Sequence, residues 1–149
     1  MSHRLERSTF IPRPRREVFQ FFANAHNLGR ITPPFLNFRI LTPDPILIRA
    51  GARIDYTIGL YGIPMKWKTL IEEFVDDSHF IDLQISGPYK LWRHRHEFHD
   101  VQGGTSMTDT VDYQLPLGPL GRIAHRLFVR AQLRAIFDYR AKIIRELFP

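Results

Sequence analysis

The last part of the chain constrains the fold most, because it predicts one long helix. From Gly121 to Phe148 there is no further glycine or proline, and apolar residues recur at helical spacing. They are Ile123, Leu127, Leu133, Phe137, Ala141, Ile144 and Phe148. At ~1.5 Å per residue, a helix of roughly 30 residues is about 40 Å long. It cannot bury its apolar stripe on itself, so the rest of the chain must cover it.

Residues 52–115 predict a meander of antiparallel strands that can provide this cover. The runs are ARIDYTIGLY (52–61), MKWKTLIEEF (65–74), HFIDLQIS (79–86), LWRHRHEFHD (91–100) and TSMTDTVDYQL (105–115). Short segments rich in Gly, Pro, Asp or Ser separate them, as is typical of hairpins. Before them, the sequence predicts a first strand at 3–11, a helix from Pro14, a second short helix before Pro33, and a short strand at 36–42.

These elements predict an α+β fold in which a curved antiparallel sheet wraps around the C-terminal helix, with the two short helices closing one end. We expect residues 1–149 to form a single domain, since the length suits one core. The chain has no cysteine, which excludes disulfides, thiol catalysis and thiolate metal sites. The first residues lack the apolar run of a signal peptide, and we expect a cytoplasmic protein.

The strand at 91–100 has two different faces. Trp92, His94, His96 and Phe98 share one face, because successive strand side chains point to opposite sides. A hairpin centred on residues 102 and 103 pairs positions that sum to 205. His96 then lies opposite Asp109, and the other pairs are 92 with Tyr113, 94 with Val111 and 98 with Met107. The alternation therefore predicts a His96–Asp109 pair on the concave face, with His94 nearby.

Four interpretations of this cluster stay open. In the first, the histidines simply satisfy one another and Asp109 in a filled core, and in the second they are the polar end of a ligand cavity. In the third, His96 acts as a general acid or base with Asp109 fixing its tautomer, which makes these two the catalytic candidates. The fourth interpretation is a metal site. No second cluster of ligand residues occurs at recognisable spacing, so the sequence predicts neither a metal nor a cofactor.

The strand at 79–86 has two possible orientations. Asp82 and Gln84 face inward in one, and Ile81, Leu83 and Ile85 do so in the other. We expect the polar pair to face solvent. On the neighbouring strands, Tyr56 and Trp67 alternate with polar residues and are candidates for a cavity wall.

Several stretches resemble the START-like, or SRPBCC, helix-grip superfamily. They are RREVFQFFANAHNLGRITPPFLNFRI (15–40), GIPMKWKTLIEEF (62–74), FIDLQISGPYKLWRHRHEF (80–98) and GGTSMTDTVDYQLPLGPLG (103–121). That group includes polyketide cyclase/dehydrase-like, coenzyme Q-binding-like and birch-pollen-allergen-type proteins. The stretches are also similar to a bacterial ligand-binding branch labelled cell-division-inhibitor-like, which is sometimes fused to a nucleotide-sugar-epimerase-like domain.

The resemblance implies binding, by a carrier or sensor, of a hydrophobic or amphipathic molecule such as a lipid, quinone or polyketide-like compound. The candidate ligand-binding residues are Tyr56, Trp67, Trp92, His94, His96, Phe98, Met107, Asp109, Tyr113 and Phe137. A cyclase- or hydrolase-like enzyme that uses His96 and Asp109 is the first alternative. The second is an interaction module with a filled core that acts through its basic C-terminal helix.

Basic residues gather in the C-terminal helix. Residues 119–149 hold seven Lys or Arg against two acidic residues. Arg122, Arg126, Arg130 and Arg134 are spaced four apart and predict a ridge along one helix face. This arginine ridge is a candidate for contact with an anionic membrane surface. No aromatic residues are interleaved with it as in nucleic-acid-binding strands, so we do not expect a nucleic-acid partner.

Overall fold

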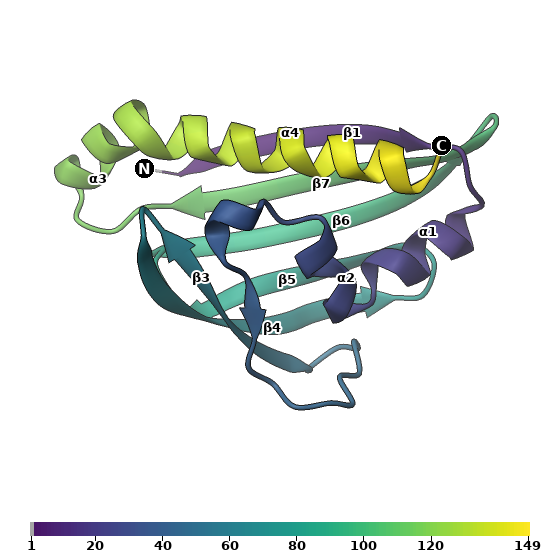
Figure 1. Cartoon of the computed structure of the whole chain (residues 1–149), viewed down its shortest axis with the longest axis horizontal. Coiled ribbons are helices and arrows are strands. Elements are labelled where there is room, and N and C mark those ends of the chain that lie inside the picture. Colours follow the sequence, from purple (N-terminus) through teal and green to yellow (C-terminus); the bar gives the residue numbers. More distant parts are fainter. Residues whose placement is uncertain (1) are drawn as a thin grey trace.

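The computed structural model describes residues 2–149 and contains a seven-stranded antiparallel sheet with one long helical segment across its concave face (Figure 1). The strand order is β1-β7-β6-β5-β4-β3-β2. The strands are β1 (His3–Ile11), β2 (Arg39–Ile40), β3 (Arg53–Leu60), β4 (Ile63–Val75), β5 (His79–Ser86), β6 (Leu91–Val101) and β7 (Gly104–Gln114). The helices are α1 (Arg15–Phe22), α2 (Ala25–Arg30), η1 (Pro34–Leu36), α3 (Pro119–Ala124), η2 (His125–Val129) and α4 (Arg130–Leu147). This is the predicted helix-grip fold, and the prediction is confirmed.

The hairpin of β6 and β7 has the predicted register. His96 pairs with Asp109, Trp92 with Tyr113, and the two strands meet at the Gln102-Gly103 turn. Gly103 has a φ of 84°, which glycine adopts without steric cost. Because turn chemistry fixes the register of a short hairpin, the sequence was sufficient to predict which side chains share the concave face.

The orientation expected for β5 is wrong at Asp82. The ladder between β4 and β5 shifts register between Ile71 and Glu73, so that Ile71 pairs with Asp82 and Phe74 with Phe80. Phe80 and Asp82 lie on the concave face because they pair directly with His96 and His94 of β6, in a ladder without a register shift. Ile81 is fully buried although it alternates with these residues, and Ile85 is exposed. Gln84 closes the following turn by hydrogen bonds to the Tyr89 backbone.

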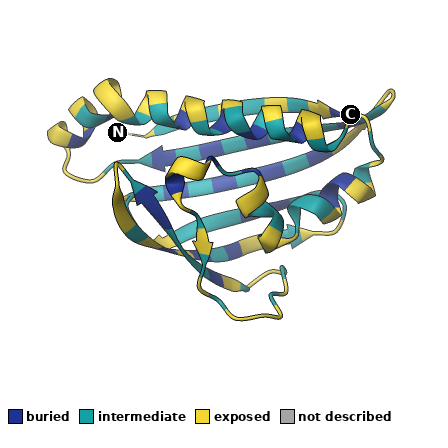
Figure 2. Ribbon diagram, viewed as in Figure 1, coloured by how far each residue is buried: buried dark blue, intermediate teal, exposed yellow. Residues whose placement is uncertain are grey.

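The C-terminal helix is continuous but changes pitch once. Residues His125–Val129 form a π-turn between α3 and α4. A π-turn absorbs one extra residue, which shifts the buried stripe by about 100° relative to a regular α-helix. Leu133, Phe137 and Ile144 are buried as predicted, whereas His125 replaces the expected Leu127. Ile123 and Leu127 are exposed, so the predicted stripe is wrong in its first two turns (Figure 2).

Two apolar clusters fill the space between helices and sheet. The first packs Phe19 of α1 on Phe98 and Met107, and includes Ile144 at the far end of α4. The second gathers seven buried residues nearer the middle of the sheet: Ile58, Trp67, Trp92, Val111, Tyr113, Leu133 and Phe137. The space left between these clusters and the early helices holds the candidate site.

Candidate functional site

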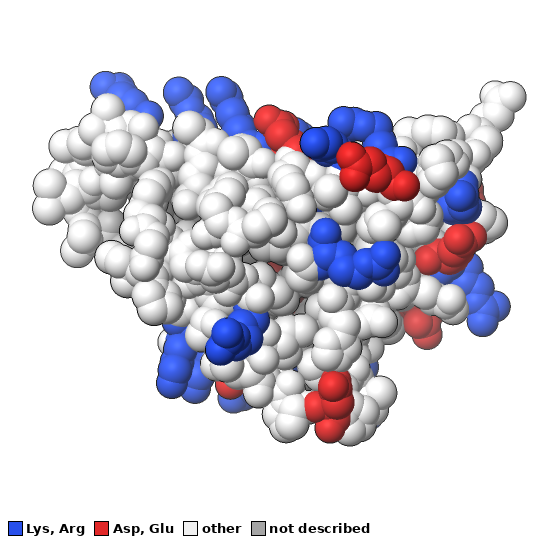
Figure 3. All heavy atoms as spheres, in the orientation of Figure 1, with Lys and Arg blue, Asp and Glu red and all other residues white. Residues whose placement is uncertain are grey.

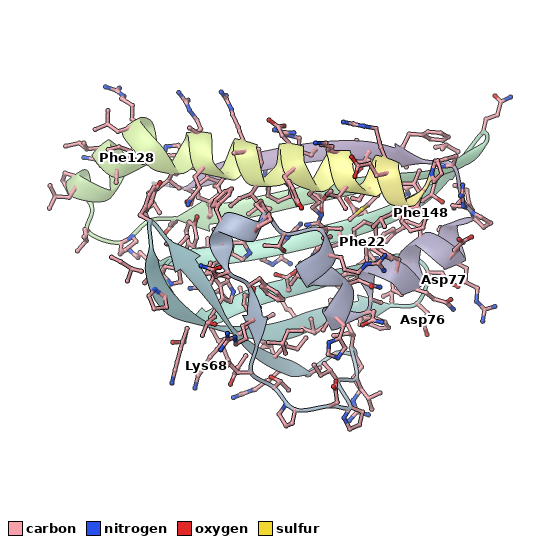
Figure 4. The ribbon with its side chains drawn as sticks, in the orientation of Figure 1. Phe22, Lys68, Asp76, Asp77, Phe128 and Phe148 are labelled. Carbon is pink, nitrogen blue, oxygen red and sulfur yellow. The ribbon has the colours of Figure 1, made fainter. Side chains whose placement is uncertain are left out.

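A cavity of about 180 Å³ lies between the concave face of the sheet, the early helices and α4. A single water needs only ~10–15 Å³ on the same kind of measure, so the cavity has room for an organic ligand. Side chains from α1, α2, η1, β3, β4, β5, β6 and α4 line it, and most are apolar. Phe22, at the end of α1, projects toward α4 in Figure 4 and belongs to this lining.

The candidate ligand-binding residues divide into two groups in the structure. Those that line the cavity are Tyr56, Trp67, Trp92, His94, His96 and Phe137. The others, Phe98, Met107, Asp109 and Tyr113, are buried behind the lining. Phe98 and Met107 pack under α1, and the Tyr113 hydroxyl forms a 2.7 Å hydrogen bond with Nε2 of His125. Ligand contact therefore remains a prediction for the first group, and the second group can act only through its neighbours.

One end of the cavity carries a buried polar cluster of Asp82, His94, His96, Asp109 and Arg140. The two imidazole rings stack, with centroids 3.7 Å apart. His96 Nε2 is 2.6 Å from Asp82 Oδ2, and His94 Nε2 is 2.7 Å from Asp109 Oδ1. An Nη of Arg140 is 3.5 Å from the same Asp109 oxygen. Each histidine thus bonds to the carboxylate diagonally opposite it rather than to its direct strand partner.

The predicted His96–Asp109 strand pair is confirmed, but the shortest hydrogen bonds of the cluster run diagonally. His96 and Asp109 are strand partners, yet Nδ1 of His96 is 3.4 Å from Asp109 Oδ1 and has no hydrogen-bond partner. The reason is the inward position of Asp82, which provides a shorter contact for His96 and leaves Asp109 to His94. Asp82, and not Asp109 alone, therefore determines the tautomer of His96.

The cluster balances its own charge. Burial alone would lower the pKa of His96, but the Asp109 and Asp82 carboxylates outweigh burial and raise it. Burial and the neighbouring His96 charge lower the pKa of His94. Burial opposes ionisation of Asp109, but Arg140 and the two histidines hold its pKa well below the usual range. The two carboxylates are therefore held ionised beside Arg140, and His96 takes up a proton more readily than His94.

Sequence reasoning did not identify Arg140 and misplaced Asp82. Arg140 is 7% exposed and lines the cavity, with its guanidinium 5.3 Å from the Phe22 ring and 5.6 Å from the Phe137 ring. The signal for Arg140 was its spacing, because it falls three residues after Phe137 and four before Ile144, on the buried stripe. Asp82 gave no such signal, since the sequence allows both orientations of its strand and only the pairing with β6 decides between them.

Buried nitrogens without a hydrogen-bond partner are left over at this site. In residues 2–149, three buried side-chain nitrogens lack a partner: Trp67 Nε1, His96 Nδ1 and Arg140 Nε. The indole N–H of Trp67 and the guanidinium N–H of Arg140 can only donate. The carboxylates of Asp82 and Asp109 are already engaged by the histidines. A molecule that satisfies this cavity must therefore supply acceptor atoms.

The comparisons place the chain in a family. A family model described as polyketide cyclase / dehydrase and lipid transport matches residues 11–137. The chain belongs to this family. No curated protein matches the sequence. Family membership agrees with the START-like, SRPBCC assignment that the sequence suggested, and it supports binding of a hydrophobic ligand in general terms.

Solved structures show the same fold. A START superfamily protein from Mycobacterium smegmatis superposes with a TM-score of 0.72 at 10% identity, covering 97% of this chain and 99% of that chain. A Thermus thermophilus protein, TTHA0849, gives 0.71 at 15% identity, with complete coverage of both chains. A nucleoside-diphosphate sugar epimerase from Corynebacterium glutamicum gives 0.66 at 28% identity, over 95% of this chain but 28% of that chain. Among residues 2–149, no helix is long and apolar enough to cross a membrane.

Proposed function

We propose that the protein binds an uncharged hydrophobic molecule with acceptor oxygens, as a carrier or sensor. The observation that carries this proposal is the pair of unpartnered donors, Trp67 Nε1 and Arg140 Nε, on residues of an otherwise apolar cavity. Quinones, polyketones and neutral esters have such oxygens. The cytoplasmic location predicted from the sequence remains part of this proposal.

Charge argues for a neutral ligand. With both carboxylates ionised, Arg140 and His96 charged and His94 neutral, the cluster has no net charge, and the directions of the pKa shifts favour this state. An added carboxylate would be a buried ion without a counter-ion, and desolvating it is costly. An amine would have to compete with the histidines for the Asp82 and Asp109 oxygens that they already contact. We therefore expect a fatty acid or an amine to bind more weakly than a neutral carbonyl compound of the same size.

Native mass spectrometry of freshly purified protein tests occupancy directly, since a bound ligand adds a few hundred daltons that denaturation removes. A titration series then compares a long-chain methyl ketone with the matching carboxylic acid and the matching amine at pH 7.5. Intrinsic fluorescence is the readout, because both tryptophans of the chain line the cavity. Equal affinity for all three compounds, or tightest binding of the acid or amine, would contradict the proposal.

The enzymatic alternative now centres on His96 and Asp82, which line the cavity together, rather than on Asp109. A His96→Gln variant separates the two functions. Loss of turnover with retained ligand binding would favour a cyclase- or hydrolase-like enzyme, and unchanged turnover would exclude His96 as its acid or base.

A second candidate function, docking on an anionic membrane surface, is favoured by exposed apolar side chains near the arginine ridge. The apolar patch comprises Tyr61, Ile63, Leu117, Leu120, Ile123, Leu127 and Phe128, all more than half exposed. Tyr61 and Phe128 join its two parts, with ring centroids 6.3 Å apart, and Figure 4 shows Phe128 at the α3 end of the molecule. Lys and Arg side chains project along the outer edge of the C-terminal helix in Figure 3.

The apolar patch adjoins the cavity in sequence and space. Leu60 lines the cavity and precedes Tyr61, and Gln132 lines it one turn after Phe128. Co-sedimentation with phosphatidylserine vesicles should therefore exceed that with phosphatidylcholine vesicles and should decrease with salt. Replacing Leu127 and Phe128 with Asp should abolish it. Equal binding to both vesicle types, or none, would refute this function.

A further inference from the structure

We propose that Asp82, His94 and His96 form a site for a divalent transition-metal ion. One ring nitrogen of His94, one ring nitrogen of His96 and a carboxylate oxygen of Asp82 all lie within 4.8 Å of one another. Asp82 Oδ2 is 2.6 Å from His96 Nε2 and 3.9 Å from His94 Nδ1. Ligand atoms at ~2.1 Å from an ion are about 3.0–3.4 Å apart. Shifts of about half an ångström would therefore bring both pairs to coordination distance.

Asp109 provides an independent reason to place an ion here. It accepts a 2.7 Å hydrogen bond from His94 Nε2 and lies 3.4 Å from the unpartnered His96 Nδ1. Both histidines thus turn one ring nitrogen toward Asp109 and the other toward Asp82. A metal-binding histidine characteristically donates its second N–H to a carboxylate, which fixes the ring and its tautomer. The Asp109 carboxylate is placed to accept such a hydrogen bond from both His94 and His96.

The donor set selects the kind of ion. Two imidazoles and one carboxylate suit Zn²⁺ or Fe²⁺, whereas Mg²⁺ and Ca²⁺ prefer oxygen ligands throughout. Three protein ligands leave at least one coordination position open, as in catalytic rather than structural sites. Asp82, His94 and His96 all line the cavity, so an open position is accessible from it.

The ion would also change the ligand class. With both histidines neutral as ligands, a doubly charged ion, two carboxylates and Arg140 leave one net positive charge. That favours an anionic oxygen, such as an enolate or carboxylate, in the open position. The metal-free cavity, in contrast, is balanced for a neutral ligand. This inference goes beyond the proposed function, which concerns the metal-free cavity; metal binding itself requires no organic ligand and is tested without one.

The test uses the untagged full chain, dialysed against EDTA and then titrated with Zn²⁺ in a calorimeter. We expect one equivalent per chain. Asp82→Asn and His96→Gln should each weaken binding by more than tenfold, and Asp109→Asn by about 10–100-fold. The matched controls are His26→Gln and His79→Gln, which remove the surface pairs of His26 with Asp44 and of His79 with Glu73. Neither control should change the affinity. No stoichiometric binding, or binding lost in a control but kept in Asp82→Asn, would overturn the proposal.

A second measurement needs no variant and remains decisive if a cluster variant does not fold. Trp92 packs with its ring centroid 6.3 Å from that of His94, and the chain has only one other tryptophan. Stoichiometric Co²⁺ should therefore quench most of the tryptophan fluorescence, and excess Zn²⁺ should restore it. Fluorescence unaffected by one equivalent of Co²⁺ would place any bound ion elsewhere and refute the site. If Co²⁺ quenches the fluorescence but the ketone does not bind, the neutral-ligand proposal is rejected and the metal site stands.

Discussion

Replacing Arg140 with leucine should destabilise the protein by about 3 kcal/mol. Arg140 is 7% exposed and, within residues 2–149, is the one arginine or lysine in an ion pair with Asp109, at 3.5 Å. Without it, the carboxylates of buried Asp109 and partly buried Asp82 have only the two histidines beside them. Breaking a buried pair on one side costs ~3–5 kcal/mol, and we take the lower value because Asp109 keeps its 2.7 Å hydrogen bond to His94. Leucine preserves apolar contact with Phe22 and Phe137.

Urea unfolding followed by circular dichroism measures this change, with the slope confirming that both proteins unfold to the same extent. Adding Asp109→Asn to the leucine variant removes the uncompensated charge and should recover about 1–2 kcal/mol, as expected for coupled neighbours. Arg134→Leu, on the exposed face of the same helix, is the control and should stay within ~0.5 kcal/mol of the parent. A loss below about 1 kcal/mol for Arg140→Leu, or a further loss on adding Asp109→Asn, would refute the charge-balance reasoning.

Three further predictions follow from single contacts. Trp67→Phe keeps an aromatic ring but removes a donor that has no partner. Because Trp67 is buried and the smaller ring leaves unfilled space, stability should fall by about 1–2 kcal/mol. Binding of a ketone ligand should weaken by about 3–10-fold in the fluorescence titration, which Trp92 still reports; unchanged affinity would show that the indole N–H does not contact ligand. Gly104→Ala should lower the free energy of unfolding by more than about 2 kcal/mol, measured by thermal unfolding, because the added Cβ would overlap the Ile11 carbonyl oxygen. A stability close to that of the parent would show that the two strands move apart at little cost. Burial, together with the His3 and Arg130 charges, lowers the pKa of His125. The unfolded chain therefore binds this proton more readily, and the group destabilises the fold as the pH falls below about 6.5. The His125→Gln variant should lose less stability than the parent protein between pH 7.5 and 5.5, and equal losses in the two proteins would contradict this prediction.

The sequence was sufficient for those parts of the fold that local chemistry determines. Alternation and a two-residue glycine turn gave the β6–β7 register, and helical spacing gave the buried residues of α4. The errors have two sources. The sequence allowed either face of β5 to point inward, and the pairing of β5 with β6 turns Asp82 to the concave face. The π-turn at His125–Val129 changed the buried face of the first helical turns.

The candidate site was predicted in part for the same reason. His94, His96 and Asp109 came from one regular hairpin, so their proximity was predictable. Their hydrogen bonds were not, because these depend on Asp82 from β5 and Arg140 from α4. Side chains from separate elements meet only through tertiary packing, and no spacing rule in a single sequence specifies that meeting.

The π-turn has a consequence for insertions and deletions in this helix. Each residue added to or removed from a helix rotates everything beyond it by about 100°. Deleting one residue within His125–Val129 would restore a regular α-helical pitch and turn α3 relative to α4, without altering the residues of α4 that line the cavity. The π-turn therefore makes the outer surface at the α3 end adjustable by one-residue length changes, while the cavity behind it keeps its shape.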